Sequence, residues 1–394
     1  MLGAVSVLAG CNHVSQALPI SLPRARSSER AMWVTRFDYK TREDVVRIVE
    51  STRTAGINTI LFQVRGNATV MYPSSIEPWA EQFNFADPGF DPLAVAIEAA
   101  HERDMRLVAW VNVVPAWWGT VPPAFAGQVY NKHPEWMWYD QHGERQALCE
   151  KFYVSLNPCL PEVRKYLVQV MRDLVGRYSV DGLHLDYLRF PNEPPATPAG
   201  SKIDYPRDAA TLALFRGETG HTPEQDPKGW NTWRTEQVSN LLRDIRRIVR
   251  QTRPSVELSA AVGPDPDKAL EHFQDVRTWL ADDLLDAVYP MNYTQDVQRF
   301  RARAEYWKEL ADGHKVVLGV RLESNDPEIL RQELEIARTM FRGYSLFAYS
   351  SIFDSPNTAI DAQDDAAREQ RQARRKALLP VLKEAAFPGA SSGV

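Results

Sequence analysis

The stretch VDGLHLDYLRFP, residues 180–191, begins like a buried strand and ends like a loop. Alternate side chains of a strand point to opposite faces, so Leu183 and Leu185 would face covering helices while Gly182, His184 and Asp186 share the other side. A buried histidine and a buried aspartate both cost free energy unless they have partners. Barrel enzymes keep their chemistry at the carboxyl ends of strands. We therefore interpret Asp186 as the centre of a functional site.

An aspartate that closes a strand can instead cap the next helix. The Pro-rich residues that begin at Pro191 count against this alternative, because the residue before a proline disfavours the helical conformation. The functional interpretation of Asp186 gains from that.

A repeated pattern of apolar strand, loop and amphipathic helix runs from residue 31 to about residue 351. This alternation predicts a parallel sheet covered by helices. Counting the start of the stretch 180–191 as the fourth strand, eight strands are expected, which predicts an α/β protein with a closed (β/α)8 TIM barrel and long insertions after strands 3 and 4. The other seven strands are expected at residues 31–35, 59–65, 107–113, 256–262, 286–293, 315–321 and 345–350.

The composition bounds the kinds of partner. The chain has 394 residues, enough for a large core, and a net charge of −5, so no basic field attracts nucleic acid or anionic lipid. Eleven Trp and fourteen Tyr offer flat faces that suit sugar rings, although most aromatic side chains in a chain of this size serve packing. The expected partner is a polysaccharide or oligosaccharide, with no cofactor and no metal.

The N-terminal residues resemble the signal of a bacterial lipoprotein. The sequence LAGC, residues 8–11, follows a short apolar run and matches a lipobox, in which Cys11 becomes the lipidated first residue of the mature protein. No basic residue precedes the run, which departs from the usual signal pattern. We expect a signal and tether at residues 1–29, a barrel at 30–355 and a C-terminal helix with a disordered tail at 356–394. A lipid anchor would then be the chain's contact with a membrane, in the bacterial cell envelope.

Two further cysteines, Cys149 and Cys159, are open to either redox state. In an exported protein they could form a disulfide, and in a cytosolic one they would stay reduced. Neither has zinc-ligand neighbours at the usual spacing.

Several blocks in order resemble the glycosyl-hydrolase-like family 10 proteins, which are bacterial barrel lipoproteins and secreted enzymes. The similarity spans residues 30–353. The resemblance implies hydrolysis of glycosidic bonds in a polysaccharide, with peptide-free peptidoglycan strands as one substrate known in the family. Some members carry a second Asp where this chain has Tyr187. The blocks are RAMWVT (30–35), FQVR (62–65), YPS (72–74), EPW (77–79), FDPL (90–93), AWVN (109–112), HPEW (133–136), residues 181–191 and YPMNY (289–293).

Glycoside hydrolysis needs two carboxyl groups, one that protonates the leaving oxygen and one that acts as nucleophile or base. Asp186 therefore needs a partner on the same rim of the barrel. Glu77 is the first candidate, because its Pro- and Trp-rich block could raise its pKa toward that of an acid. Asp38 is the second candidate and Glu323 a weaker third. Each of them could equally be a solvated loop carboxylate or a helix cap.

Polar and aromatic residues near the strand ends are expected to bind the sugar. The alternatives are a satisfied interior position for His184 and an ion pair for Arg65. The expected binding residues are Trp33, Arg65, Trp110, Asn112, His184, Tyr187, Arg189, Asn292, Tyr293 and Tyr349.

Two other functions stay open at this point. His184 and Asp186 could be ligands of a hydrolytic metal, although no other strand end offers a histidine. The chain could also be a catalytically inactive, tethered glycan-binding lipoprotein, which Tyr187 and the lack of an evident acid keep in view.

Overall fold

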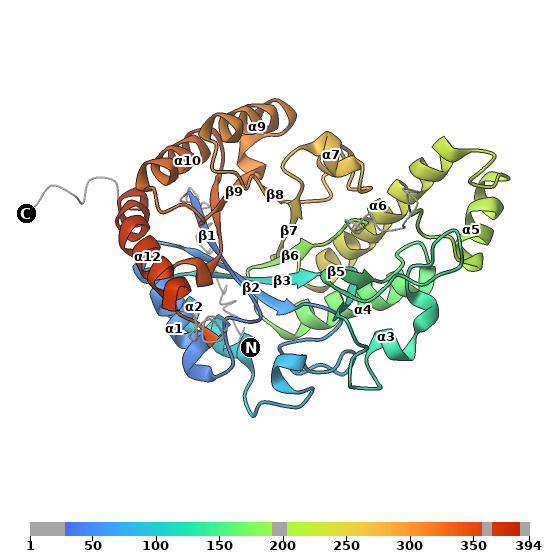
Figure 1. Ribbon diagram of the computed structural model, residues 1–394, viewed down its shortest axis with the longest axis horizontal. Helices are drawn as coiled ribbons and strands as arrows, with labels where there is room; N and C mark the ends of the chain where they lie inside the picture. The colour runs from blue at the N-terminus through green and yellow to red at the C-terminus, as the bar shows by residue number, and fades with distance from the viewer. Residues whose placement is uncertain (1–27, 191–202, 357–364, 387–394) are drawn as a thin grey trace, which may run out of the picture.

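The computed structural model describes residues 28–190, 203–356 and 365–386. Eight parallel strands form one sheet in the order β8-β7-β6-β3-β2-β1-β10-β9, curled nearly into a ring with helices outside (Figure 1). The predicted barrel is thereby confirmed. The strands are β1 (Glu29–Val34), β2 (Thr59–Arg65), β3 (Arg106–Asn112), β6 (Gly182–Asp186), β7 (Glu257–Val262), β8 (Ala287–Pro290), β9 (Val317–Arg321) and β10 (Gly343–Phe347).

The neighbouring strands of the barrel are not all paired to the same extent. Seven neighbouring strand pairs share runs of four or more paired residues, with one register shift, between Gln63 and Arg65 of β2. Between β8 and β9 the described residues form one isolated bridge, from Val288 to Val316. Gly319 of β9 also lies close to the backbone of Pro290 and Met291, so the barrel closes here with fewer paired residues than at its other strand pairs.

Helices follow the strands, and local signals in the sequence explain where several begin. Thr41 and Asp44 form a capping box before α1, while Asp91 and Asp326 cap α2 and α10 with proline in the first turn. The helices are α1 (Arg42–Thr54), α2 (Pro92–His101), α3 (Val129–Lys132), α4 (Pro161–Arg177), α5 (Ala209–Thr219), α6 (Pro227–Thr252), α7 (Pro266–Leu270), α8 (Val276–Ala281), α9 (Val297–Leu310), α10 (Pro327–Met340) and α12 (Asp365–Ala386), with 3-10 turns η1 (Glu81–Phe83), η2 (Pro134–Trp136), η3 (Gly313–Lys315) and η4 (Tyr349–Ser351).

The insertion after the fourth barrel strand is more ordered than its composition suggests. The sequence predicts a helix over residues 235–252, after a segment rich in proline, glycine and charge at 192–233. In the structure Asp208 caps α5, and Asp226 with Pro227 starts α6 eight residues before the predicted start. α5 and the beginning of α6 lie to the side of the barrel, and the rest of α6 packs beside α4 (Figure 1). Asp208, Asp226 and Pro227 mark the starts of these helices. A segment with so much proline and charge is nevertheless easily taken for a loop when only its composition is considered.

The insertion after β3 contains an antiparallel hairpin of β4 (Pro115–Gly119) and β5 (Cys149–Ser155). Its inner face packs on the core through Trp117 and Val154. The pairing shifts register on both sides of the Trp117–Val154 pair, and the neighbouring Trp118 is exposed. Cys149 and Cys159 both carry free thiols, and Cys159 is buried.

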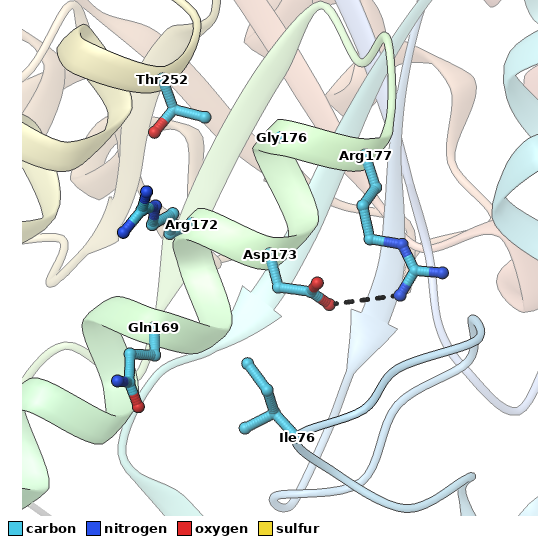
Figure 2. A pocket seen from close by; sticks show the side chains of 7 residues that line it. All are labelled: Ile76, Gln169, Arg172, Asp173, Gly176, Arg177 and Thr252. Carbon is cyan, nitrogen blue, oxygen red and sulfur yellow. Dashed lines mark ion pairs between the residues drawn. The ribbon is translucent and has the colours of Figure 1, made fainter.

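Outside the barrel, α4 borders a surface hollow of about 490 Å³ (Figure 2). Arg177 lies 3.6 Å from Asp173 there, and Ile76 contributes from the loop after β2. The hollow lies on the flank of the helical layer and has no residue in common with the Asp186 cavity described below.

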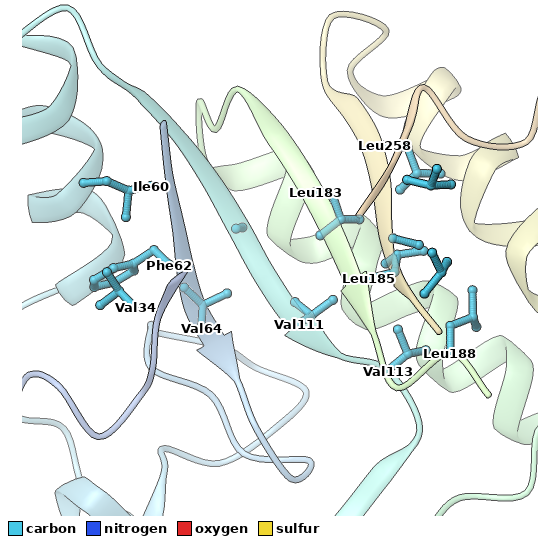
Figure 3. Packing of buried hydrophobic residues seen from close by; sticks show 14 of the residues in the cluster. Val34, Ile60, Phe62, Val64, Val111, Val113, Leu183, Leu185, Leu188 and Leu258 are labelled. Carbon is cyan, nitrogen blue, oxygen red and sulfur yellow. The ribbon is translucent and has the colours of Figure 1, made fainter. Parts of the chain in front are cut away.

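The main core lies between the sheet and its helices, as Figure 3 shows for ten labelled side chains. Leu183 and Leu185 of β6 belong to it with no exposed surface, as strand alternation predicts. Burial of such side chains stabilises the fold by roughly 1.5–3 kcal/mol each. The labelled residues are Val34, Ile60, Phe62, Val64, Val111, Val113, Leu183, Leu185, Leu188 and Leu258.

A buried ionic layer closes the amino-terminal end of the barrel. Arg106 binds Glu29 at 3.0 Å and Glu257 at 3.1 Å, and Arg342 binds the same two carboxylates at 2.5 and 2.8 Å. Each charge thus has two partners, which is the condition under which buried charges are tolerated. The ion pairs at this end of the barrel therefore serve its structure, and the cavity lies at the opposite end.

The predicted lipidation site Cys11 and the residues 1–27 of the predicted tether lie outside the described residues, as do residues 387–394 of the predicted tail. Within the described ranges, no helix combines the length and apolar character that crossing a bilayer requires.

Candidate active site

A cavity of about 230 Å³ opens where the barrel strands end. It is lined from six barrel strands or the residues directly after them, and from the hairpin through Tyr153. Asp186 is the one acidic residue in its described lining. The lining residues are Trp33, Thr35, Arg36, Phe37, Gln63, Trp110, Asn112, Tyr153, Asp186, Tyr187, Arg189, Met291, Tyr293 and Phe347.

Asp186 ends β6 with 6 % of its surface exposed. Its Oδ1 atom accepts a hydrogen bond from the backbone of Tyr187 at 2.7 Å and from Arg189 at 3.4 Å. Its Oδ2 atom accepts none from the described residues. One carboxylate oxygen is therefore held in place while the other stays available for a ligand.

Tyr187 sits beside Asp186 in an unusual backbone conformation, with φ of 52°. The left-handed region is uncommon for a residue other than glycine, and such strain clusters at functional sites. The conformation sets the Tyr187 ring between the Tyr153 ring, 5.1 Å away edge-on, and the Arg189 guanidinium, 4.5 Å away. At the position where the family resemblance implies a second aspartate in some members, this chain therefore has an aromatic side chain in the cavity wall.

The floor of the cavity carries polar atoms without partners. The indole nitrogens of Trp33 and Trp110 and the Oδ1 atom of Asn112 are buried, with no hydrogen bond. Trp33 and Trp110 pack edge to face at 4.8 Å, which fixes both rings. A buried polar atom without a partner costs about 1–3 kcal/mol. Three such atoms belong to cavity-lining residues, and others lie away from the cavity, in Thr52, Tyr72 and Trp230.

Arg36 also lines the cavity with 1 % of its side chain exposed. Its Nη1 atom donates to the Tyr153 hydroxyl at 3.3 Å, and its guanidinium carbon lies 4.3 Å from the centre of the Phe37 ring. Burial works against the charged form, but the nearby Tyr153 and Glu81 outweigh it and raise the pKa of Arg36. A permanent positive charge therefore stands in the cavity wall.

The structure does not bring Glu77 into this cavity. Glu77 is closed to solvent and binds Arg65 through both carboxylate oxygens, and Tyr166 donates to it at 2.6 Å. Arg65, an expected binding residue, is likewise committed to this pair and to backbone oxygens. The alternative interpretation of Arg65 as an ion-pair partner matches the geometry, and the catalytic role of Glu77 stays a prediction.

Asp38 also lies outside the cavity lining. Its carboxylate accepts hydrogen bonds from the backbone and hydroxyl of Thr35, both at 2.8 Å, and from Ser355 at 2.9 Å. Burial raises the pKa of this carboxyl group. Glu323 is half-exposed and pairs with Arg321 at 2.6 Å. Neither of these two candidate acids lines the cavity that contains Asp186.

Of the ten expected binding residues, six line the cavity and four do not. His184 is fully buried below it, where Ser259 lies 2.8 Å from Nδ1, and desolvation lowers the pKa of His184 to about 3. Asn292 donates to a backbone oxygen of α9, and Tyr349 is buried in η4. Arg65 is paired as described. The six in the lining are Trp33, Trp110, Asn112, Tyr187, Arg189 and Tyr293.

A metal site was one alternative for His184 and Asp186. No group of three His, Cys, Asp or Glu residues is close enough to hold a metal within the parts of the chain that the structure describes. The neutral, buried His184 ring instead packs against Trp33 and Tyr289 at 4.9 and 4.7 Å. The geometry supports an interior histidine, whose Nδ1 atom contacts Ser259 while its Nε2 atom has no hydrogen-bond partner among the described residues.

Seven lining residues were not expected from the sequence. The alternation of β2 places Gln63 on the interior face, and the end of β1 points to Arg36, so these two could have been found. Tyr153 enters from the hairpin, whose placement no local pattern specifies. The seven are Thr35, Arg36, Phe37, Gln63, Tyr153, Met291 and Phe347.

Comparisons with known proteins agree with this architecture. The family model of Glycosyl hydrolase-like 10 matches residues 28–319. Over 318 residues the chain is 25% identical to glycosyl hydrolase DigH of Escherichia coli K12, covering 73% of this chain and 64% of that protein. It is 22% identical over 290 residues to glycosyl hydrolase YngK of Bacillus subtilis, covering 68% and 52%. The chain thus spans about half to two thirds of these relatives.

Solved structures share the fold. The glycoside hydrolase domain of PgaB (BpsB) from Bordetella bronchiseptica superposes with a TM-score of 0.60 at 16% identity, covering 88% of this chain and 99% of that one. The catalytic domain of a β-amylase from Paenibacillus polymyxa gives 0.57 at 10% identity, covering 86% and 98%. At these identities the likeness concerns the barrel alone.

Proposed function

Because the chain belongs to the glycosyl hydrolase-like 10 family, we propose that it hydrolyses glycosidic bonds in a polysaccharide, with Asp186 as a catalytic carboxylate. The observation that carries the proposal is the position of Asp186. It is the one described acid in a cavity whose floor leaves polar atoms of Trp33, Trp110 and Asn112 without partners. A saccharide offers many hydroxyl groups that can supply those bonds.

The proposed roles follow from the contacts. Arg189 and the Tyr187 backbone orient one oxygen of Asp186, leaving the other to meet the glycosidic oxygen or the anomeric carbon. Tyr187 and Tyr153 offer ring faces and edges to the sugar. The reaction needs a second carboxyl group or an equivalent. The sequence predicts Glu77 or Asp38 for this role, but neither lines the cavity, so the second group has no assigned residue in this proposal.

We propose peptide-free peptidoglycan glycan strands as the first substrate to test. Cys11, if lipidated as expected, would place the protein in the cell envelope, where such strands occur. The test measures new reducing ends released by the wild-type protein and by Asp186→Asn. Proton transfer by a positioned group contributes about 10²- to 10⁴-fold, so the variant should lose at least that factor.

The matched control is Glu271→Gln, which removes an exposed carboxylate after β7 and should keep full turnover. The fold of each variant is checked by its thermal transition. Full activity of a folded Asp186→Asn protein would remove Asp186 from the mechanism. Retention of glycan by the wild-type protein without release of reducing ends would instead support the non-catalytic glycan-binding function.

A further inference from the structure

The lining of the Asp186 cavity carries more positive than negative charge. Arg189 pairs with Asp186 at 3.4 Å, so these two charges offset each other. Arg36 has no acid in the described lining, and the nearest carboxylate oxygen, Oε1 of Glu81, lies 3.9 Å from its Nη2 atom. A charge at a poorly hydrated site acts strongly on an entering ion, so this cavity favours an anionic group.

Neighbouring residues keep space for the Arg36 side chain. A Cβ atom on Gly66 would lie 2.4 Å from the guanidinium carbon, so any other residue at position 66 would displace Arg36. The Phe37 ring and the Tyr153 hydroxyl hold the guanidinium from other directions. A guanidinium fixed in this way loses little freedom when it binds a ligand.

One edge of the Arg36 guanidinium makes no hydrogen bond to the described residues. Its Nε and Nη2 atoms are buried and have no hydrogen-bond partner in the described structure. Arg65 shows what this edge binds in the same protein, because its Nε and Nη2 atoms hold the two oxygens of Glu77 at 2.8 and 2.7 Å. The planar fork of two N–H groups matches a carboxylate.

We infer that Arg36 binds a carboxylate of the substrate, so that this protein prefers glycans that carry carboxyl groups over neutral glycans of the same backbone. The inference rests on the proposed function and adds a specificity-determining residue to it. The bound carboxylate would complete the two N–H groups that the protein leaves open and balance the charge of the cavity.

The experiment compares two preparations of one glycan. Peptide-free peptidoglycan strands are assayed before and after their carboxyl groups have been reduced to alcohols. We expect the wild-type kcat/KM to be about 10- to 100-fold higher on the carboxylated strands, the range for a hydrogen-bonded charged group. In Arg36→Gln the ratio should fall close to one, and Arg36→Lys should restore part of it, because it keeps the charge and loses the fork.

Glu81→Gln is the matched control. If Arg36 served only to pair with Glu81, both substitutions would alter stability alike and neither would change the substrate preference. Equal rates of the wild-type protein on the two preparations would overturn the inference and leave the proposed function intact. This comparison needs no variant, so it holds even where Arg36→Gln fails to fold.

Hydrolysis of neither preparation would count against the proposed function on this substrate. Binding then decides the inference separately. The wild-type protein should bind polygalacturonate and should not bind its fully methyl-esterified form. The two polymers have the same backbone, and the ester lacks the charge. Equal retention of the two polymers would overturn the inference.

Discussion

Arg65 and Glu77 form an ion pair closed to solvent on both sides, with Nη2 of Arg65 2.7 Å from Oε1 of Glu77. Tyr166 adds a hydrogen bond to the same oxygen. The loop after β2 is thereby tied to the end of its own strand and to α4. A carboxylate in this setting is a structural anchor unless it leaves the pair.

Glu77→Gln tests this assignment directly. The substitution leaves the Arg65 charge buried without its partner, so we expect the free energy of unfolding in urea to fall by about 3–5 kcal/mol. Turnover measured where the variant is still folded should stay within about tenfold of the wild-type value, since Glu77 does not line the cavity.

The control is Glu323→Gln, which removes one partner of a half-exposed pair and should change stability by less than about 1 kcal/mol. Unchanged stability with lost turnover would make Glu77 the catalytic partner of Asp186. If the Glu77 and Asp38 variants both keep turnover, a group of the substrate is the next candidate, as in substrate-assisted glycosidases.

Trp118 is expected to bind a sugar beyond the cavity. Its ring is 40% exposed, is fixed by a hydrogen bond from Nε1 to the backbone oxygen of Glu150 at 2.8 Å, and lies on β4, which pairs with the strand that carries Tyr153. Trp118→Ala should raise KM for long glycan strands about three- to tenfold with kcat unchanged, the loss typical of one aromatic contact. Phe125→Ala removes a ring of similar exposure, 43%, and should leave KM alone. The same KM increase in both variants would contradict a specific subsite.

His184 should make stability depend on acid pH. The pKa of the folded-state imidazole is about 3, against about 6.5 in the unfolded chain, because burial disfavours the charged ring. Below pH 6.5 the unfolded chain therefore binds a proton that the folded protein does not. The contribution of His184 is complete above pH 6.5 and is lost toward pH 3, by about 1.4 kcal/mol per pH unit. His184→Gln should flatten the urea-unfolding free energy between about pH 4 and 7 relative to the wild-type protein. Parallel curves for the two proteins would show that this ring does not titrate on unfolding.

Glu333 should have the opposite effect at higher pH. It lies on α10 with 3 % of its surface exposed, and burial raises its pKa from 4.5 to about 8. Between these values the unfolded chain releases a proton that the folded protein keeps, so stability falls as pH rises. Glu333→Gln should therefore stabilise the protein by about 2–3 kcal/mol at pH 7 and by little below pH 4.5. Glu335→Gln on the exposed face of the same helix should change stability by less than about 0.5 kcal/mol. A gain that does not vary with pH would exclude this cause.

Much of the fold could be predicted from local patterns. The predicted range of β2 agrees with the structure at both ends, and Thr41 and Asp326 mark helix starts because caps act over three or four residues. The hairpin of β4 and β5 was not expected, because its pairing depends on tertiary packing. The early start of α6 was missed where proline and charge were taken for a loop.

The site was predictable to the extent that it follows from alternation along single strands. Asp186, Trp110 and Asn112 project toward the cavity for this reason. Which carboxylate faces Asp186 depends on side chains from distant loops, and Glu77 and Asp38 find nearer partners in Arg65 and Thr35. Family blocks indicate which residues matter, but a block that serves an ion pair looks the same in sequence as one that serves catalysis.

The single bridge between β8 and β9 has a mechanical consequence for the site. Met291 and Tyr293 follow β8 directly, so the cavity wall they form stands on the least restrained part of the ring. The cavity, about 230 Å³, is smaller than the roughly 300 Å³ at which pockets begin to enclose whole ligands. We therefore expect this wall to move when a ligand enters, while the wall formed by β1, β2 and β3 stays in place.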